Sequence, residues 1–171
     1  MSLQQEKKAK AIIIGVAPIS AYQEDLFNKA ELPIYSTYGM TETCTHIAIR
    51  KIGEQNFKAL KNVYFDVDER DCLIINSPTA IENPLITNDV IELISNQEFI
   101  WKGRFDNIIN SGGVKIQVEQ LESKIENILI TRNQNTRFII SSKQDDKLGS
   151  KIILIAENEI DKAFIEKNLE S

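Results

Sequence analysis

Residues 33–51 have the sequence PIYSTYGMTETCTHIAIRK, in which a strand, a polar loop and a second strand follow one another directly. Pro33 opens the first strand, and β-branched and aromatic residues suited to a sheet follow it. The loop YGMTET, residues 38–43, then gathers a glycine, two threonines and an acid. Open α/β sheets bind ligands beyond the carboxyl ends of their strands, so this loop is a candidate binding site.

The residues before this stretch predict a crossover connection. AIIIGV, residues 11–16, is an apolar, β-branched run typical of a strand buried on both faces of a sheet. Ser20 is a predicted helix N-cap, and residues 21–32 follow it with a helical stripe of apolar side chains. Strand, helix and strand within so few residues indicate a parallel pair.

The residues after the loop predict a change of architecture. Several short runs, some with period-two alternation, indicate an antiparallel sheet or a β-barrel-like subdomain; they span 46–52, 62–68, 72–77, 89–95 and 98–103. ERDC, residues 69–72, is a predicted hairpin turn between two of them. Beyond Arg104, two amphipathic helices alternate with short strands. We therefore predict α/β plus α+β: a large-domain portion at 1–103, a boundary at 104–106 and a small α+β domain at 107–171.

Composition narrows the class of protein. The chain has 171 residues, of which 42% are hydrophobic, and its net charge is −5. A nucleic-acid binder needs clustered Lys and Arg, which this acidic chain lacks, and no apolar run is long enough for a membrane span. Cys44 and Cys72 match neither a metal pair nor a disulfide framework, which favours two buried thiols in a cytoplasmic protein. The polar residues 1–10 do not resemble a signal peptide.

The YGMTET loop has the groups that a nucleotide and its metal need. Gly39 allows close backbone approach, the hydroxyls of Thr41 and Thr43 suit phosphate oxygens, and the Glu42 carboxylate suits magnesium. Tyr38 offers a flat face or edge for a base. From spacing alone, a turn whose threonine hydroxyls bond the backbone is the favoured alternative.

Two further stretches have matching chemistry. Asp89 lies between a turn residue and a strand, where an acid can accept both hydroxyls of a ribose. Arg104 lies close in sequence to Lys102 and Lys115, and its planar guanidinium suits phosphate or ribose oxygens. Taken alone, a turn-capping aspartate and a surface arginine on a hairpin remain the simpler interpretations.

Four stretches of the chain resemble, in the same order, four successive core motifs of the adenylate-forming acyl-CoA synthetase superfamily, the AMP-binding enzymes. They are AIIIGVAPIS, YGMTET, TNDV and GRFDNIINSGGVKIQVEQLE. The resemblance extends over residues 11–165. Within the superfamily, the sequences STYGMTETCTHIA and LITNDVIEL are most similar to those of the o-succinylbenzoate:CoA ligases of menaquinone biosynthesis. The resemblance implies an ATP-dependent ligase that converts a small carboxylic acid into an acyl-AMP and then into a coenzyme A thioester. A homo-oligomer is left open.

The resemblance also implies roles for individual residues. The implied nucleotide site comprises Gly15, Ala17, Tyr38, Gly39, Thr41, Asp89 and Arg104. Thr41 would contact the α-phosphate and Glu42 would hold Mg²⁺, which makes these two the implied catalytic residues. Asp89 would bind the ribose hydroxyls with help from Arg104. Asp106 corresponds to the hinge of a mobile C-terminal domain, and Gly112 and Gly113 to the channel for the pantetheine arm of coenzyme A.

The chain departs from the family pattern in four respects. Val16 stands where many members have a second glycine, and Asn88 replaces the common glycine before Asp89. A Ser/Thr/Gly-rich phosphate loop with its lysine does not precede residue 11, and a C-terminal Gly-Lys does not follow residue 165. Lys151 opens a predicted strand and is not counted as that lysine. These departures imply an internal or C-terminal part of a longer enzyme that does not adenylate by itself.

Two alternatives remain open on the sequence. One is another acyl- or aryl-CoA synthetase or adenylation domain of the superfamily, and the other is a non-catalytic ligand-binding module that retains the fold. His46 is interpreted as a strand residue, because a single histidine without neighbouring ligands makes no site. Trp101 is interpreted as a packing residue at the domain junction.

Overall fold

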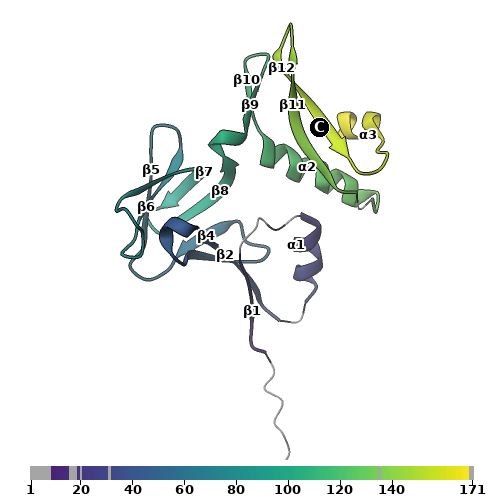
Figure 1. Ribbon diagram of the computed structural model, residues 1–171. Helices are drawn as coiled ribbons and strands as arrows, with labels where there is room; N and C mark the ends of the chain where they lie inside the picture. Colours follow the sequence, from purple (N-terminus) through teal and green to yellow (C-terminus); the bar gives the residue numbers. More distant parts are fainter. Residues whose placement is uncertain (1–8, 16–18, 20, 31, 135, 170–171) are drawn as a thin grey trace, which may run out of the picture.

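Two sheets, each with its own hydrophobic cluster, make up the molecule (Figure 1). The computed structural model describes residues 9–15, 19, 21–30, 32–134 and 136–169. The first sheet has eight strands in the order β1-β2-β3-β4-β8-β7-β6-β5, and the second has four in the order β10-β9-β12-β11. The fold is therefore α+β, with one mixed sheet, one antiparallel sheet and few helices.

The elements of the first sheet follow the order of the chain. They are β1 (Ile12–Ile14), α1 (Ala21–Asn28), β2 (Ile34–Gly39), the 3₁₀ turn η1 (Thr41–Thr43), β3 (His46–Lys51), β4 (Asn56–Ala59), β5 (Tyr64–Val67), β6 (Cys72–Asn76), β7 (Leu85–Ser95) and β8 (Glu98–Arg104). The elements of the second part are η2 (Phe105–Asn107), β9 (Ile108–Ser111), β10 (Val114–Gln117), α2 (Val118–Thr131), β11 (Phe138–Asp145), β12 (Gly149–Ala156) and α3 (Lys162–Leu169).

The predicted crossover is confirmed, but the predicted burial of its first strand is wrong. β1 pairs with β2 in parallel, with Ile12 opposite Ile34, and α1 lies between them in the sequence. Ile12 is 41% exposed and Ile13 is 62% exposed. The reason is position: β1 ends the strand order of the sheet, so among the described residues only β2 pairs with it. The predicted N-cap Ser20 lies outside the described residues.

The antiparallel part of the first sheet encloses the larger core. Pairings from β2 to β8 are antiparallel, and the predicted hairpin turn joins β5 to β6, with Asp71 at φ 61°. Nine buried residues form the core: Ile47, Ala48, Val63, Phe65, Leu73, Ile75, Leu85, Ile91 and Phe99. β1 and β5 are the two ends of the strand order, so the sheet is open rather than a closed barrel.

The second sheet packs against α2 and α3 around a smaller core. Ile125 and Leu129 of α2, Ile140 of β11 and Ile165 of α3 are its buried members. α2 is one of the two amphipathic helices predicted beyond Arg104, and its apolar face packs here, since Val118, Leu121 and Ile128 lie against these four residues. The α+β arrangement of helices and strands that was predicted after Arg104 is therefore present.

The two parts meet at the end of β8. Gly103 has φ +138°, a conformation that side chains rarely adopt, and a Cβ there would lie 2.3 Å from Gln117 Nε2 and 2.4 Å from Glu119 Oε2. The positive φ favours glycine at this position, and the ends of the Gln117 and Glu119 side chains occupy the space beside it. Gln117 Nε2 donates to the Arg104 carbonyl at 2.8 Å, and the Arg104 amide donates to Glu119 Oε1 at 3.2 Å.

Two chain-wide predictions can be compared with the structure. Within the described residues, no helix is both long enough and apolar enough to cross a membrane. Both cysteines are free, but Cys44 is exposed, so the prediction of two buried thiols holds only for Cys72. Cys44 is the C-cap residue of η1, with φ 60°, and its side chain lines a cleft that is open to solvent.

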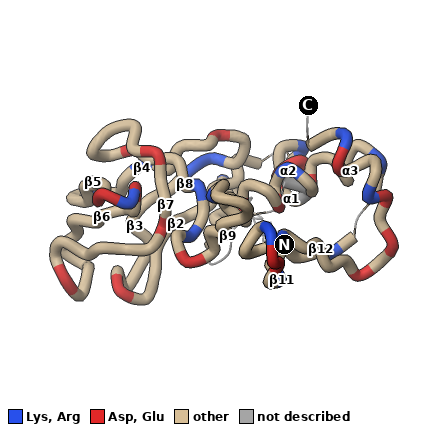
Figure 2. Tube along the Cα trace, turned by 90° about the horizontal axis from the view of Figure 1, so that it is seen from above, with Lys and Arg blue, Asp and Glu red and all other residues tan. Residues whose placement is uncertain are grey.

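The acidic character of the chain is visible on the first sheet. Figure 2 shows red acidic segments at the loops around β5 and β6.

The fully buried ring of Phe99 should carry much of the stability of the first sheet. It stacks on Phe57 at 5.5 Å between centroids and meets Phe65 edge-on at 4.9 Å. We expect Phe99→Ala to lower the free energy of unfolding by about 3 to 5 kcal/mol because it removes these contacts and leaves a cavity. Urea unfolding followed by Trp101 fluorescence measures the loss, since Trp101 packs against this core. Ile86→Ala, at a side chain that is 60% exposed, should change it by less than about 0.5 kcal/mol.

Candidate nucleotide-binding cleft

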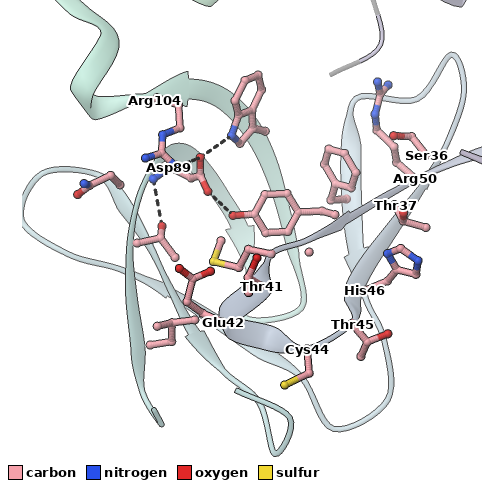
Figure 3. A pocket seen from close by; sticks show the side chains of 18 of the residues that line it. Ser36, Thr37, Thr41, Glu42, Cys44, Thr45, His46, Arg50, Asp89 and Arg104 are labelled. Atoms are coloured by element: carbon pink, nitrogen blue, oxygen red, sulfur yellow. Dashed lines mark hydrogen bonds and ion pairs between the residues drawn. The ribbon is translucent and has the colours of Figure 1, made fainter. Parts of the chain in front are cut away.

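A cleft of about 1010 Å³ lies along the first sheet near its junction with α2 (Figure 3). Its walls come from the end of β2 and η1, from β7, from the end of β8 and from the start of α2. The cleft therefore brings together residues that lie far apart in the sequence: Tyr38, Thr41, Glu42, Asp89, Trp101 and Arg104.

The Asp89 carboxylate is the most constrained polar group of the cleft. It is only 5% exposed, and both of its oxygens are hydrogen-bonded (dashed lines in Figure 3). Oδ2 accepts the Tyr38 hydroxyl at 2.6 Å, Oδ1 accepts the Trp101 indole N–H at 3.2 Å, and Arg104 Nη1 lies 3.7 Å from Oδ1. Each carboxylate oxygen has a further lone pair, so Asp89 can still accept from a ligand hydroxyl.

Sheet register explains why Asp89 and Arg104 meet. Asp89 of β7 and Arg104 of β8 are directly paired residues in the antiparallel ladder. Thr87 supports the same part of β7, because its hydroxyl donates to the Leu73 carbonyl at 2.9 Å and accepts the Asp89 amide at 3.1 Å. The carboxylate is thus held from its backbone as well as from its side chain.

Tyr38 has a different environment from the one expected for a base-stacking residue. Its ring lies within the aromatic cluster, 5.2 Å from Phe99 and 5.8 Å from Phe57 between centroids. Burial, followed by the nearby Asp89 carboxylate, raises the pKa of Tyr38 well above its ordinary value of 10.0. The hydroxyl therefore stays protonated and acts as a hydrogen-bond donor to Asp89.

The two threonines of the YGMTET loop have different surroundings. The Thr43 side chain is fully buried; its hydroxyl lies 2.9 Å from the Met40 carbonyl and 2.8 Å from that of Thr45, and it accepts the Met40 amide at 3.1 Å. It is therefore a turn-forming residue, as in the turn interpretation favoured by spacing alone, and its buried hydroxyl does not face the cleft. Thr41 and Glu42 are exposed and line the cleft, where their oxygens are accessible to a ligand.

The glycines of the predicted site serve local packing. A Cβ on Gly39 would lie 2.6 Å from the Thr45 carbonyl oxygen, so the approach of β3 requires glycine there. A Cβ on Gly15 would lie 3.0 Å from Thr37 Oγ1 and 3.1 Å from His46 Cε1. His46 begins β3, as expected of a strand residue, and also lines the cleft. The predicted site residue Ala17 lies outside the described residues.

The predicted hinge and coenzyme A residues lie away from the centre of the cleft. Asp106 in η2 is exposed and accepts from Arg104 Nη2 at 2.9 Å. Gly112 and Gly113 form the tight turn between β9 and β10, with φ +59° and +85°, and the Gly112 amide donates to the Leu148 carbonyl. Neither glycine is among the residues that line the cleft. The described structure does not bring this turn to Thr41 and Asp89.

The donor set tests whether a magnesium ion fits. The part of the chain that the structure describes has no group of three or more His, Cys, Asp or Glu side chains that could hold a metal. Mg²⁺ usually takes only one or two protein carboxylates and fills its remaining positions with water and phosphate oxygens. One exposed carboxylate, Glu42, at the cleft is compatible with that mode of binding.

Sequence reasoning missed two residues of the site. Trp101 was interpreted as a packing residue, yet its indole N–H orients Asp89. Asn88 was interpreted only as a departure from a glycine, yet its side chain reaches Asp106 at 3.2 Å. The signal for Trp101 was its position three residues before Arg104 on a strand, but only the register shows which neighbour it faces.

Removing the Tyr38 hydroxyl should change how stability depends on pH. Folding raises the pKa of Tyr38, so above about pH 10 the native state keeps a proton that the unfolded state loses. The stability that the protonated Tyr38 hydroxyl contributes is fully present below about pH 10 and is lost as pH rises through the pKa of Tyr38 in the folded state. We expect the free energy of unfolding to fall more steeply above about pH 10 in the wild type than in Tyr38→Phe.

Urea unfolding at a series of alkaline pH values measures both slopes. Tyr64→Phe, at a tyrosine that is 48% exposed, is the matched control and should keep the wild-type slope. Equal slopes for Tyr38→Phe and the wild type would contradict the raised pKa that burial and the nearby Asp89 carboxylate give Tyr38.

Comparison with known proteins finds CoA ligases among the structural neighbours. No family model and no curated protein sequence matches the chain. Among solved structures, an acyl-CoA synthetase (AMP-forming)/AMP-acid ligase II-like protein from Dyadobacter fermentans is 33% identical with a TM-score of 0.54, and the match covers 92% of this chain and 46% of that one.

Two other neighbours superpose better at lower identity. The o-succinylbenzoate CoA synthetase from Bacillus subtilis, in complex with its acyl-adenylate intermediate, has a TM-score of 0.75 at 18% identity and covers 94% of this chain and 39% of that one. Coronafacic acid ligase from Pectobacterium brasiliense has a TM-score of 0.70 at 18% identity, with coverage of 98% and 39%. The chain thus spans less than half the length of these solved relatives. The two structures at 18% identity show a similar fold, and the neighbour at 33% identity is an AMP-forming acyl-CoA synthetase-like protein.

Proposed function

We propose that the chain forms part of the nucleotide site, the hinge and part of the small domain of an ATP-dependent acid:CoA ligase. One observation supports this most strongly: Thr41, Glu42, Asp89 and Arg104, which the resemblance assigns to one adenylate, line a single cleft. A turn-capping aspartate would not require burial in a cleft with neutral donors on both oxygens. The arrangement favours a ligand that brings hydroxyl groups to Asp89.

The proposed reaction has two steps. A carboxylate oxygen of the acid attacks the α-phosphorus of ATP, and pyrophosphate leaves as the acyl-AMP forms. The thiolate sulfur of coenzyme A then attacks the acyl carbon, and AMP leaves as the thioester forms. Both steps are promoted mainly by positioning and by neutralising charge on the phosphate oxygens. In this chain, Asp89 holds the ribose and the Thr41 hydroxyl donates to the α-phosphate.

Glu42 is the proposed contact to magnesium. The ion, when bound with the nucleotide, supplies positive charge against the phosphate oxygens. Glu42 projects from η1, one residue after Thr41, so the acid and the proposed phosphate donor share one rigid turn. The buried Thr43 hydroxyl holds this turn through its contacts to the Met40 and Thr45 carbonyls.

Residues 104–106 are the proposed hinge between a portion at 1–103 and a portion at 107–171. The first hydrophobic cluster includes Trp101 as its last packed member, and the second begins with Ile109. The chain between them adds nothing to either cluster. Rotation there would carry the Gly112–Gly113 turn to a new position, and in our proposal that turn then admits the pantetheine arm of coenzyme A.

The acid is proposed to be o-succinylbenzoate, which would place the enzyme in menaquinone biosynthesis. This assignment rests on the residues of the YGMTET and TNDV motifs and on the similarity of the fold to that of the Bacillus subtilis synthetase. Coronafacic acid ligase superposes almost as well, so another acid of the same reaction class is the second candidate. A non-catalytic module of the same fold is the third.

AMP should bind this chain through Asp89. We expect Asp89→Asn to weaken AMP binding by about 10- to 100-fold, because the variant loses a charged acceptor for the ribose hydroxyls. Isothermal titration calorimetry measures the affinities. Asp66→Asn removes an exposed carboxylate on β5 and should bind AMP as the wild type does. Equal affinities for the two variants would exclude Asp89 as the ribose ligand.

The chain by itself should not carry out the first step. Its sequence holds neither a phosphate loop with a lysine nor a C-terminal Gly-Lys, so the implied charge-neutralising lysines are missing. With ATP, Mg²⁺ and o-succinylbenzoate, we expect no pyrophosphate above background in a coupled assay. The Bacillus subtilis synthetase serves as the positive control. Pyrophosphate release above background by this chain would refute the proposal that its activity needs further residues.

A further inference from the structure

We propose that Asn88 is a positioning residue that ties Asp106 to the first sheet and so holds the C-terminal part of the chain in the pose seen here. Asn88 is on β7, directly before Asp89. Its side chain bridges two charged groups: Oδ1 accepts from Arg70 Nη1 at 3.1 Å, and Nδ2 donates to Asp106 Oδ1 at 3.2 Å and Oδ2 at 3.3 Å.

The chemistry of the bridge is specific for an amide. Arg70 can only donate hydrogen bonds, and the ionised Asp106 carboxylate can only accept them. A side chain between the two must therefore present an acceptor on one side and a donor on the other. Asparagine does this, whereas aspartate at the same position would repel Asp106 and glycine would make neither contact. The two charged neighbours also fix which end of the amide faces each of them.

Arg70 is itself held firmly, which makes it a suitable anchor. Its Nε donates to Asp68 Oδ2 at 2.8 Å, and its Nη2 lies 3.3 Å from the Thr87 carbonyl. The guanidinium also lies over the Phe105 ring, 5.2 Å from the centroid. Arg70 therefore contacts both Asn88 and the residue that precedes Asp106.

The bridge adds a tie to Asp106 from a residue that is distant in the sequence. Arg104, its ion-pair partner, is only two residues away and ends β8, where it is paired with Asp89. On the opposite side, Glu119 Oε1 accepts from the Arg104 amide at 3.2 Å and from Asn107 Nδ2 at 2.6 Å. Residues 104–107 are thus held from the first sheet, through Asn88, the Asp89–Arg104 pair and the Arg70–Phe105 contact, and from α2, through Glu119. Breaking the Asn88 contact should loosen the segment on its first-sheet side.

Hydrogen exchange of this chain, without ligand, tests the bridge. In Asn88→Gly, we expect the amides of residues 104–108 to exchange about 3- to 10-fold faster than in the wild type, because loss of the bridge favours local opening. Asn88→Asp should exchange at least as fast. Asn76→Gly makes the same change on a neighbouring strand away from the junction and should leave these amides at the wild-type rate. Rates within about twofold of the wild type in both Asn88 variants would overturn the proposal.

A second variant protects the test against misfolding. Asp106→Ala removes the partner from its exposed side, together with the Arg104 ion pair, so it should accelerate exchange at least as much as Asn88→Gly. If Asn88 acts through Asp106, the double variant should exchange no faster than Asp106→Ala alone. Additive accelerations would mean that Asn88 acts elsewhere. Unchanged exchange at Leu73–Ile75 shows that the first sheet remains folded in each variant.

Only the description of residues 104–106 as a hinge rests on the proposed function. Hydrogen exchange with and without AMP tests the proposed nucleotide site separately from the Asn88 bridge. If AMP protects neither residues 38–42 nor Asp89 from exchange in the wild type, the proposed nucleotide site fails, while the bridge is still judged by the ligand-free rates. If AMP protects these residues but the Asn88 variants exchange as the wild type does, the bridge fails and the nucleotide site stands.

Discussion

The hydrogen bond between the Tyr38 hydroxyl and the Asp89 carboxylate is the contact on which the rest of the cleft depends. A carboxylate that is 5% exposed is costly unless donors surround it, and Tyr38 and Trp101 supply neutral donors to its two oxygens. Tyr38 is on β2, Asp89 is on β7 and Trp101 is on β8, so one carboxylate joins three strands. The loop with Thr41 and Glu42 starts just after Tyr38, and its position over the cleft follows from the same bond.

The junction between the two parts has the opposite character. The sheet cores are apolar, but the contacts between β8 and α2 are made by amides, carboxylates and main-chain groups around Gly103. Polar contacts of this kind exchange readily for contacts with water, and interfaces between domains of one chain are typically more polar than cores. These polar contacts agree with our proposal of a hinge at residues 104–106, whereas the first sheet is held by buried aromatic contacts around Phe99.

Local patterns in the sequence were sufficient for most elements. The crossover at β1 and β2, the hairpin at 69–72 and the packed face of α2 follow from periodicity and turn residues, which depend on neighbours in the chain. The exposure of Ile12 and Ile13 could not be predicted in this way. A β-branched apolar run has the same sequence in a central strand and in an edge strand, and only the strand order distinguishes them.

The sequence by itself determined which chemical groups are present: a glycine- and threonine-rich loop, an aspartate at a strand and an arginine before a double glycine. The tertiary structure decided how these groups are used. Thr43 became a buried turn residue and Thr41 an exposed one, although both have the same hydroxyl. Trp101 and Asn88 acquired their partners through the β7–β8 register and the path of the chain into η2. The physical reason is that a hydrogen bond depends on distance and direction between groups many residues apart, which composition and spacing do not specify.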